Sequence, residues 1–305
     1  MRALVTGGGG FVGQWLVRHL RSSGDEVLLI DREVDITDGL AVRDAVSSAA
    51  PEAIYHLAAF THVGRSWSMP KETLEVNAFG TLHVLEAARQ SSPQARVLLI
   101  SSSEVYGKAE GEDLPLSEGA PLKPVTPYAA SKVAAEFLGL QAYLGHGLAV
   151  VRARPFNHVG PGQQQSFAVP GLAARIKAAL DSGARTIPVG NLEPRRDFTD
   201  VRDVVAAYRL LVLHGEPGEV YNVSSGVDVS IAEIASALVR LAGAQVELVV
   251  DPDLVRAVDL PVISGDSTRL RLATGWRPVY SLEDTLKDVL ASTSSGSEPA
   301  RERPV

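Results

Sequence analysis

The sequence contains no cysteine and no excess of positive charge. Without cysteine, the protein has no disulfide, no thiolate nucleophile and no Cys-ligated metal, and nothing else in the sequence indicates a metal site. The net charge of -7 gives no reason to expect a nucleic acid or an anionic membrane as partner. No apolar run is long enough to span a bilayer, and no basic segment followed by an apolar one resembles a leader. We therefore expect a soluble, cytoplasmic protein.

Apolar residues, in contrast, make up 45% of the 305 residues, enough for a substantial core. Strand-like and helix-like segments alternate through the first half of the chain. This alternation predicts an α/β protein with a Rossmann-type, doubly wound parallel sheet. We expect residues 1–155 to form a cofactor domain, to which residues 199–225 return. Residues 156–198 and 226–291 would form a smaller α/β lobe, and the polar residues 292–305 a disordered tail.

Three glycines are spaced for a dinucleotide site. Gly7, Gly10 and Gly13 lie between a predicted strand over 2–6 and a predicted helix over 14–21. Such a turn lets the backbone approach a pyrophosphate, and the following helix N-terminus supplies N–H groups and a positive dipole. Phe11 and Val12 belong to the same turn, and we predict that they contact the cofactor with the glycines. The alternative is a flexible glycine turn without a ligand.

The acidic residue at the end of the second predicted strand bears on the choice of cofactor. Asp31 is placed to bind the adenosine ribose hydroxyls and would repel a 2′-phosphate, which favours NAD(H) over NADP(H). The adjacent Arg32 could offset this preference, and Asp31 could instead cap a turn. Further residues expected to border the cofactor are Asp35 and Ile36, which could reach the adenine, and Leu57, Ala58 and Ala59 after the third strand.

Tyr128 and Lys132 are four residues apart, so a helix places both side chains on one face. We expect the Lys132 ammonium to lower the pKa of the Tyr128 phenol toward the range useful for proton transfer. Ser102, at the carboxyl end of a buried strand over 96–101, would bond the oxygen atom that Tyr128 protonates or deprotonates. The alternative is a Tyr/Lys pair on the surface of an ordinary helix. Together with the glycine turn, the three residues indicate proton transfer to an alcohol while a nicotinamide moves a hydride.

Two further features allow more than one interpretation. We expect one helix over 72–90, in which Asn77 could hold a water of a proton relay or simply bond to backbone. The second half carries arginines in predicted loops, which indicate either a solvated surface or a pocket for phosphates. Because the first half already accounts for the cofactor pyrophosphate, a second cationic set suggests a nucleotide sugar.

At this point the chain resembles the extended short-chain dehydrogenases/reductases that act on nucleotide sugars, from residue 1 to about 291. Within them it is most similar to the GDP-4-keto-6-deoxy-D-mannose reductases, followed by the GDP-mannose 4,6-dehydratases. The motifs that carry the resemblance are Thr6-Gly7-x-x-Gly10-Phe11-Val12-Gly13, His56-Leu57-Ala58-Ala59, Asn77-Ala78-Phe79-Gly80-Thr81, Ser102-Ser103-Glu104, Tyr128-Ala129-Ala130-Ser131-Lys132, Phe156-Asn157-His158-x-Gly160-Pro161-Gly162-Gln163, Val189-Gly190-Asn191-Leu192-Glu193 and Arg196-Asp197-Phe198-Thr199-Asp200.

The resemblance implies a role for each residue that matches these motifs. Ser102, Tyr128 and Lys132 would be catalytic, and Asn77 would border the cofactor. The residues implied to hold the nucleotide sugar are Asn157, Val169, Arg175, Arg196, Arg256 and Asp259, with Val169 and Arg175 at the guanosine diphosphate. The resemblance also implies a homodimer that packs through the helices beginning near Glu72 and Tyr128.

The expected reaction is NAD(P)H-dependent reduction of the C4 keto group of GDP-4-keto-6-deoxy-D-mannose, giving GDP-rhamnose or its C4 epimer. Because of Glu104, a GDP-mannose 4,6-dehydratase remains an alternative, since such an enzyme needs a carboxylate to take the C5 proton. Two features favour a reductase. The loop after Asn157-His158 resembles the reductases, and the segment between Asp31 and Asp35 is too short for the dehydratase insertion. The motifs are also compatible with a nucleotide-sugar 4-epimerase and with a catalytically silent dinucleotide sensor.

Overall fold

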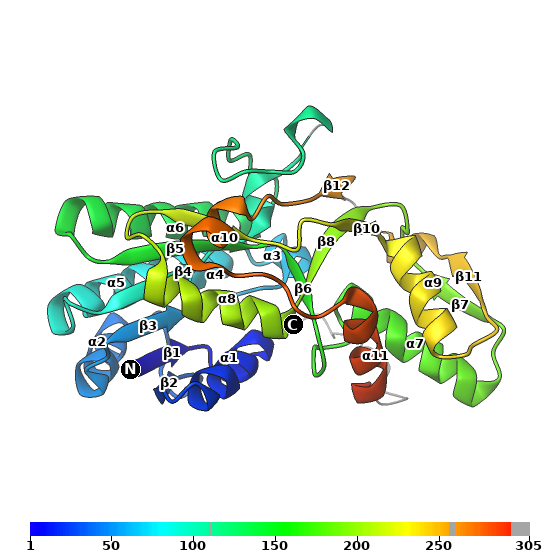
Figure 1. The fold of residues 1–305 in the computed structure, drawn as a ribbon, viewed down its shortest axis with the longest axis horizontal. Coiled ribbons are helices and arrows are strands. Elements are labelled where there is room, and N and C mark those ends of the chain that lie inside the picture. Colours follow the sequence, from blue (N-terminus) through cyan, green and yellow to red (C-terminus); the bar gives the residue numbers. More distant parts are fainter. Residues whose placement is uncertain (110, 256–259, 294–305) are drawn as a thin grey trace.

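A parallel sheet of six strands forms the centre of the protein (Figure 1). The computed structural model describes residues 1–109, 111–255 and 260–293. In spatial order the strands are β2 (Glu26–Ile30), β1 (Arg2–Thr6), β3 (Ala53–His56), β4 (Arg96–Ile100), β5 (Val150–Pro155) and β9 (Val220–Val223). All five neighbouring pairs are parallel. β3, β5 and β9 are buried along their whole length, as expected for a sheet covered on both faces. The predicted fold class is confirmed.

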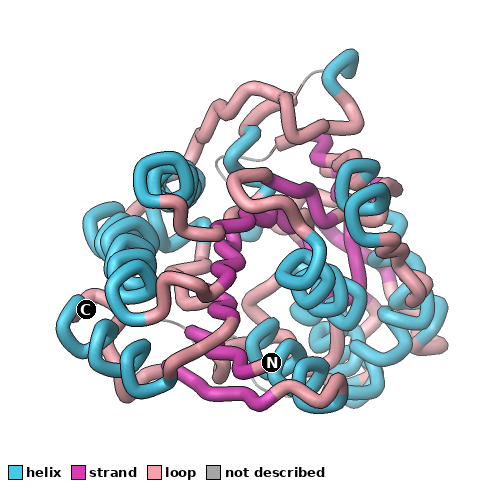
Figure 2. Tube along the Cα trace, turned by 60° about the vertical axis from the view of Figure 1, so that its left-hand side comes forward, coloured by secondary structure: helices cyan, strands magenta, loops and turns pink. Residues whose placement is uncertain are grey.

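Helices cover both faces of this sheet, which Figure 2 shows as strands between two helical layers. α1 (Phe11–Ser22) and α8 (Val201–His214) pack on one face, where Leu16, Leu20 and Leu211 belong to one apolar cluster with β1 and β3. α2 (Gly39–Ala49), α5 (Gly80–Ser91) and α6 (Pro127–His146) contribute to the cluster on the other face. The carboxyl ends of β1, β3 and β4 therefore open toward one edge, where ligands bind in such sheets.

The predicted single helix over 72–90 is interrupted. α4 (Pro70–Leu74) passes into a π-helical turn over Glu75–Phe79 before α5 begins at Gly80. Asn77 lies in that turn, and a wider turn of this kind marks functional sites in many proteins. Helix propensity and hydrophobic periodicity carry no signal for the wider hydrogen-bonding pattern of a π-helix. The sequence therefore could not predict this turn.

A third apolar cluster, separate from the two on the sheet, lies in what we call the C-terminal lobe. The lobe is built from α7 (Ala168–Ser182), α9 (Ile231–Leu241), α11 (Leu282–Ser292) and the parallel pair β7 (Thr186–Val189) and β11 (Glu247–Val250), at the right of Figure 1. The predicted tail began at residue 292, yet Ser292 is the last residue of α11 and Thr293 accepts a bond from Lys177. Residues 294–305 lie outside the described part.

Small strands join the sheet to the lobe. β8 (Arg195–Asp200) pairs with β6 (Asn157–Val159), β10 (Asp228–Ser230) and β12 (Val262–Ile263). The turn residues and amides over 156–163 predict a loop; this prediction is wrong for residues 157–159, which form β6, and β8 was not expected at all. β8 reads RRDFTD, and its polar composition hides a strand whose backbone is paired on both sides. α10 (Thr268–Thr274) and the short α3 (Val63–Ser66) complete the named helices.

Candidate active site

The glycine turn lies against the segment that follows β3. Gly7 has a φ of +72°, and a Cβ atom there would come within 2.8 Å of the Ala58 backbone nitrogen. Side chains larger than hydrogen are therefore excluded where the two predicted cofactor segments meet. Gly10 precedes α1 in an extended conformation, and its N–H donates to the Gly7 carbonyl at 3.1 Å. The turn and the helix N-terminus thus form a cradle of backbone groups, which fits a pyrophosphate.

The Asp31 side chain lies over this cradle. A Cβ atom on Gly9 would be only 2.0 Å from Asp31 Oδ2, so the carboxylate rests directly against the turn. Arg32 is exposed beside it. Asp35 accepts bonds from Thr37 N at 2.9 Å and Thr37 Oγ1 at 2.8 Å, and Ile36 is buried in the core against Gly80. The side chains of Asp35 and Ile36 therefore organise the turn after β2, while Asp31 faces the cradle.

α6 delivers the tyrosine and the lysine, and its start is well defined. Thr126 caps the helix by accepting from Ala129 N at 3.0 Å, and Pro127 occupies the first turn. The Ser66 hydroxyl accepts from Tyr128 N at 3.2 Å. Because both ends of these bonds are buried, the helix N-terminus is fixed relative to the sheet edge.

Lys132 and Tyr128 are both buried, and burial changes both of their pKa values. The Lys132 ammonium donates to the Ile100 carbonyl at 2.9 Å, and burial lowers the pKa of Lys132 to about 8. Burial raises the pKa of Tyr128 to about 12; the hydrogen bond with Ser102 acts in the lowering direction and the Glu104 carboxylate in the raising one. The expectation that Lys132 lowers the Tyr128 pKa was wrong, because desolvation of the phenol dominates. The phenol is protonated at neutral pH.

Asn77 is held from two sides. Its Oδ1 accepts from Phe60 N at 2.7 Å, and its Nδ2 donates to Phe60 O at 3.1 Å and to Ser131 Oγ at 2.8 Å. Ser131 in turn donates to the Tyr128 carbonyl at 2.7 Å. Of the two interpretations of Asn77, the structure supports bonding to backbone. Through Ser131, Asn77 also connects the π-helical turn to α6 at the Tyr128 carbonyl.

A cavity of 380 Å³ lies between the sheet edge and the C-terminal lobe. It brings together five residues singled out from the sequence: Glu104, Asn157, Val169, Arg175 and Arg196. The two guanidinium groups are braced by backbone carbonyls. Arg175 Nη1 donates to Pro188 O at 2.7 Å, and Arg196 Nη1 donates to Leu260 O at 2.6 Å. The predicted Arg256 and Asp259 fall outside the described residues.

Several residues of the cavity wall were not predicted. The segment over 61–64, just beyond β3, and the residues around the start of α7, including Gln165, Ser166 and Phe167, all line the cavity. His158 also lines it; its Nδ1–H donates to the Phe156 carbonyl at 3.1 Å and its ring stacks on Phe11 of the glycine turn. The rule that ligands bind beyond the carboxyl ends of strands could have indicated the segment after β3.

Neither a cluster of potential metal ligands nor a membrane-spanning helix is found in the described part of the chain. None of its His, Asp and Glu side chains gather in a group that could hold a metal ion. None of the helices in the same ranges has the length and apolar character needed to cross a membrane.

The backbone cradle, the buried tyrosine and lysine and the adjoining cavity place the protein among the extended short-chain dehydrogenases/reductases. Such enzymes act on nucleotide sugars with a nicotinamide dinucleotide cofactor. The family model described as GDP-mannose 4,6 dehydratase matches residues 32–289, and the chain belongs to this family.

Individual relatives agree with this family. GDP-6-deoxy-D-mannose reductase of Pseudomonas aeruginosa is 38% identical, with 96% of this chain and 97% of that protein aligned. A solved structure of RMD from Pseudomonas aeruginosa complexed with NADPH has a TM-score of 0.88 and 36% identity, covering 96% of this chain and 98% of that one. Thermus thermophilus UDP-glucose 4-epimerase in complex with NAD has a TM-score of 0.85 and 30% identity, covering 96% and 99%.

Proposed function

We propose that the enzyme reduces the C4 keto group of GDP-4-keto-6-deoxy-D-mannose with NAD(P)H. The observation that carries the proposal is the cavity that two backbone-braced arginines line together with Glu104, which lies two residues after Ser102. Guanidinium groups match the diphosphate of a nucleotide sugar. The similarity to GDP-6-deoxy-D-mannose reductase supports the choice of a GDP-linked 6-deoxy sugar.

The reduction needs a proton donor at the forming C4 alkoxide. When bound, the reduced nicotinamide supplies the hydride. Tyr128, whose raised pKa keeps its phenol protonated, gives its proton to the C4 oxygen, and Ser102 orients that oxygen. Lys132 lies one helical turn from Tyr128, and we assign its ammonium to the nicotinamide ribose and to the charge that develops on Tyr128 O. Reduction from one face of the sugar gives GDP-rhamnose, and from the other its C4 epimer.

A 4,6-dehydratase is the second candidate, since Glu104 lines the same cavity and the family carries that name. A dehydratase must first oxidise C4, with Tyr128 as the base, and a 4-epimerase begins in the same way. The higher identity to GDP-6-deoxy-D-mannose reductase, 38% compared with 29% to a GDP-mannose 4,6-dehydratase and 34% to a UDP-glucose 4-epimerase, favours the reductase.

Two incubations separate these functions. Reductase activity predicts that GDP-4-keto-6-deoxy-D-mannose consumes reduced cofactor, while GDP-mannose with oxidised cofactor gives no product. Formation of a product lighter by one water in the second incubation would instead establish a dehydratase. If neither substrate reacts, the GDP-sugar assignment fails, and UDP- and dTDP-sugars are tested next.

For the cofactor we propose a preference for NADH over NADPH. The Asp31 carboxylate rests against the turn, where the 2′-phosphate of NADPH would meet a like charge. The Pseudomonas RMD structure holds NADPH and the Thermus epimerase holds NAD, so related proteins use both forms. In Asp31→Asn we expect the preference to shift toward NADPH; an unchanged ratio of kcat/KM values would contradict this role.

We also propose that the enzyme is a homodimer in the cytoplasm. Large apolar side chains stand exposed along α4, the π-helical turn and α6, including Leu74, Phe79 and Phe137. Such a face on adjacent helices is typical of an interface between copies. Phe79→Glu should produce monomers in sedimentation experiments, whereas Leu272→Glu, on the exposed face of α10, should leave the dimer intact. A wild-type monomer would contradict the proposal.

A further inference from the structure

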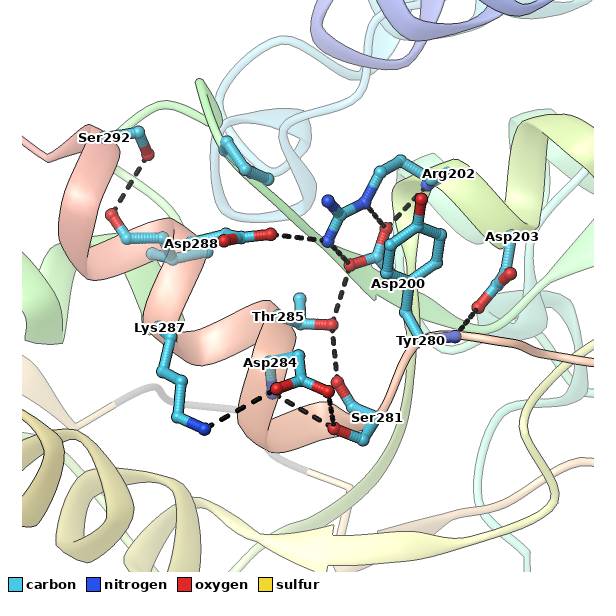
Figure 3. Close-up of polar contacts among 12 residues, drawn as sticks. Asp200, Arg202, Asp203, Tyr280, Ser281, Asp284, Thr285, Lys287, Asp288 and Ser292 are labelled. Atoms are coloured by element: carbon cyan, nitrogen blue, oxygen red, sulfur yellow. Dashed lines mark hydrogen bonds and ion pairs between the residues drawn. The ribbon is translucent and has the colours of Figure 1, made fainter.

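An ion-paired cluster fastens α11 of the C-terminal lobe to α8, which covers the sheet (Figure 3). Arg202, in the first turn of α8, donates from Nε and Nη2 to the two carboxylate oxygens of Asp200, both at 2.8 Å. The same Nη2 reaches Asp288 Oδ2 on α11 at 2.8 Å. The guanidinium also lies over the Tyr280 ring, 3.7 Å from its centroid. One side chain thus joins two helices and the segment between α10 and α11.

A second set of bonds, which the Arg202 side chain does not itself make, holds the same segment. Thr285 Oγ1 on α11 donates to Asp200 Oδ2 at 2.7 Å (Figure 3). The backbone N–H groups of Val279 and Tyr280 both donate to Asp203 Oδ2 at 3.0 Å. Two carboxylates at the start of α8 therefore fix residues 279–285. Arg202 adds a further bond to α11, at Asp288, one helical turn after Thr285.

The cluster also reaches the cofactor site and the cavity wall. Arg202 lies 6.0 Å from the Trp15 ring centroid, and Trp15 belongs to α1, the helix that follows the glycine turn. Trp15 Nε1 donates to the Pro161 carbonyl at 3.1 Å. Pro161 lies in the loop that leads from β6 to Gln163, which lines the cavity. The Arg202 guanidinium thus contacts side chains of α1 and α11, and Trp15 of α1 extends the connection to this loop.

We propose that Arg202 and Asp288 are positioning residues that set the distance between the bound nucleotide sugar and Tyr128. Val169 and Leu172 of α7 line the cavity, and α7 shares its apolar cluster with α11, whereas Tyr128 belongs to the sheet side. The position of α11 therefore determines where the lobe presents the sugar to the catalytic residues. The proposal rests on the proposed function, because it concerns the same nucleotide-sugar site.

The variants Arg202→Met and Asp288→Asn test this, with Arg240→Gln as the matched control. Arg240 pairs with Glu283 on α11 at 2.9 Å, but from α9 within the lobe, so its loss breaks an α11 ion pair without touching α8. Since a shift of about 1 Å can cost about 100-fold, we expect kcat to fall about 10- to 100-fold in Arg202→Met. We expect a smaller, few-fold loss in Asp288→Asn and no change in Arg240→Gln.

The binding of ligands separates positioning from general damage. The GDP dissociation constant and the number of cofactor sites per chain should match wild type in Arg202→Met, so that only kcat per bound cofactor falls. Arg202→Lys, which keeps the charge, should recover part of the activity. A wild-type kcat in Arg202→Met, or an equal loss in Arg240→Gln, overturns the proposal.

Hydrogen exchange gives a readout that does not depend on the substrate. Arg202→Met should accelerate amide exchange in α11 and in residues 160–163 together, while Arg240→Gln should leave 160–163 unchanged. If wild type does not consume GDP-4-keto-6-deoxy-D-mannose, the proposed function fails, and the exchange pattern still decides the role of Arg202. Unchanged exchange at both segments in Arg202→Met overturns it.

Discussion

The catalytic residues on the sheet side and the arginines on the lobe side are held in different ways. On the sheet side, Tyr128 and Lys132 are buried; the backbone N–H of Tyr128 donates to Ser66, and the Lys132 ammonium donates to the carbonyl at the end of β4. On the lobe side, Arg175 and Arg196 are partly exposed and come from a helix and a polar strand, each braced by a carbonyl of another segment. The comparison teaches that packing of the core fixes the residues of the chemical step. The residues expected to bind the nucleotide sugar are instead partly exposed, and a few substitutions can exchange them.

The largest expected effect comes from the sheet side. Tyr128→Phe removes the proton donor, and turnover should fall by about 10²- to 10⁴-fold, the range of general acid catalysis. Cofactor affinity should remain near wild type, as measured by titration with reduced cofactor. Tyr143→Phe, on the same helix but away from the site, is the control and should be active. An active Tyr128→Phe enzyme would remove Tyr128 from the mechanism.

Substitutions on the lobe side should instead weaken binding of the nucleotide sugar. Arg196→Met should raise KM for the nucleotide sugar about 10- to 100-fold, as expected for a lost charged hydrogen bond of about 1.5–3 kcal/mol. KM for the reduced cofactor should change little. Arg195→Met is the matched control, because Arg195 is the neighbour of Arg196 on β8 but pairs with Asp228 and Glu233 instead of lining the cavity. Equal effects in both variants would mean that β8 stability, and not diphosphate binding, determines KM.

The smallest effect concerns pH. Burial lowers the Lys132 pKa to about 8, so the ammonium is present below this pH and is lost as the pH rises through it. Tyr128 stays protonated over the same range, since its pKa is raised to about 12. We expect kcat to decline by a few-fold on the alkaline side, around pH 8. In Lys132→Arg, whose guanidinium remains charged, this decline should vanish at a lower overall rate. A wild-type profile that is flat to about pH 10 would contradict the assignment.

The same contrast explains how far the sequence could predict the structure. The parallel sheet, the glycine turn and the Tyr128–Lys132 helix follow from strong local signals: buried apolar strands, fixed glycine spacing and helical periodicity. Five of the predicted residues do share one cavity, although their roles stay predictions.

Other features leave no local signal. β8 has a polar sequence, and its three neighbours, β6, β10 and β12, all come from distant parts of the chain. The π-helical turn at Asn77 and the raised Tyr128 pKa depend on packing around them. The Arg202 cluster joins residues 86 positions apart, a distance at which one sequence carries no pairing information.

The transfer of a labelled hydride tests the central claim most directly. Reduced cofactor carrying deuterium at the transferred position of the nicotinamide is incubated with the enzyme and GDP-4-keto-6-deoxy-D-mannose, and the product is analysed by NMR. Reduction at C4 predicts one deuterium per product sugar, located at C4, with loss of label from the cofactor. A product without deuterium, or with the label at another carbon, would contradict the account.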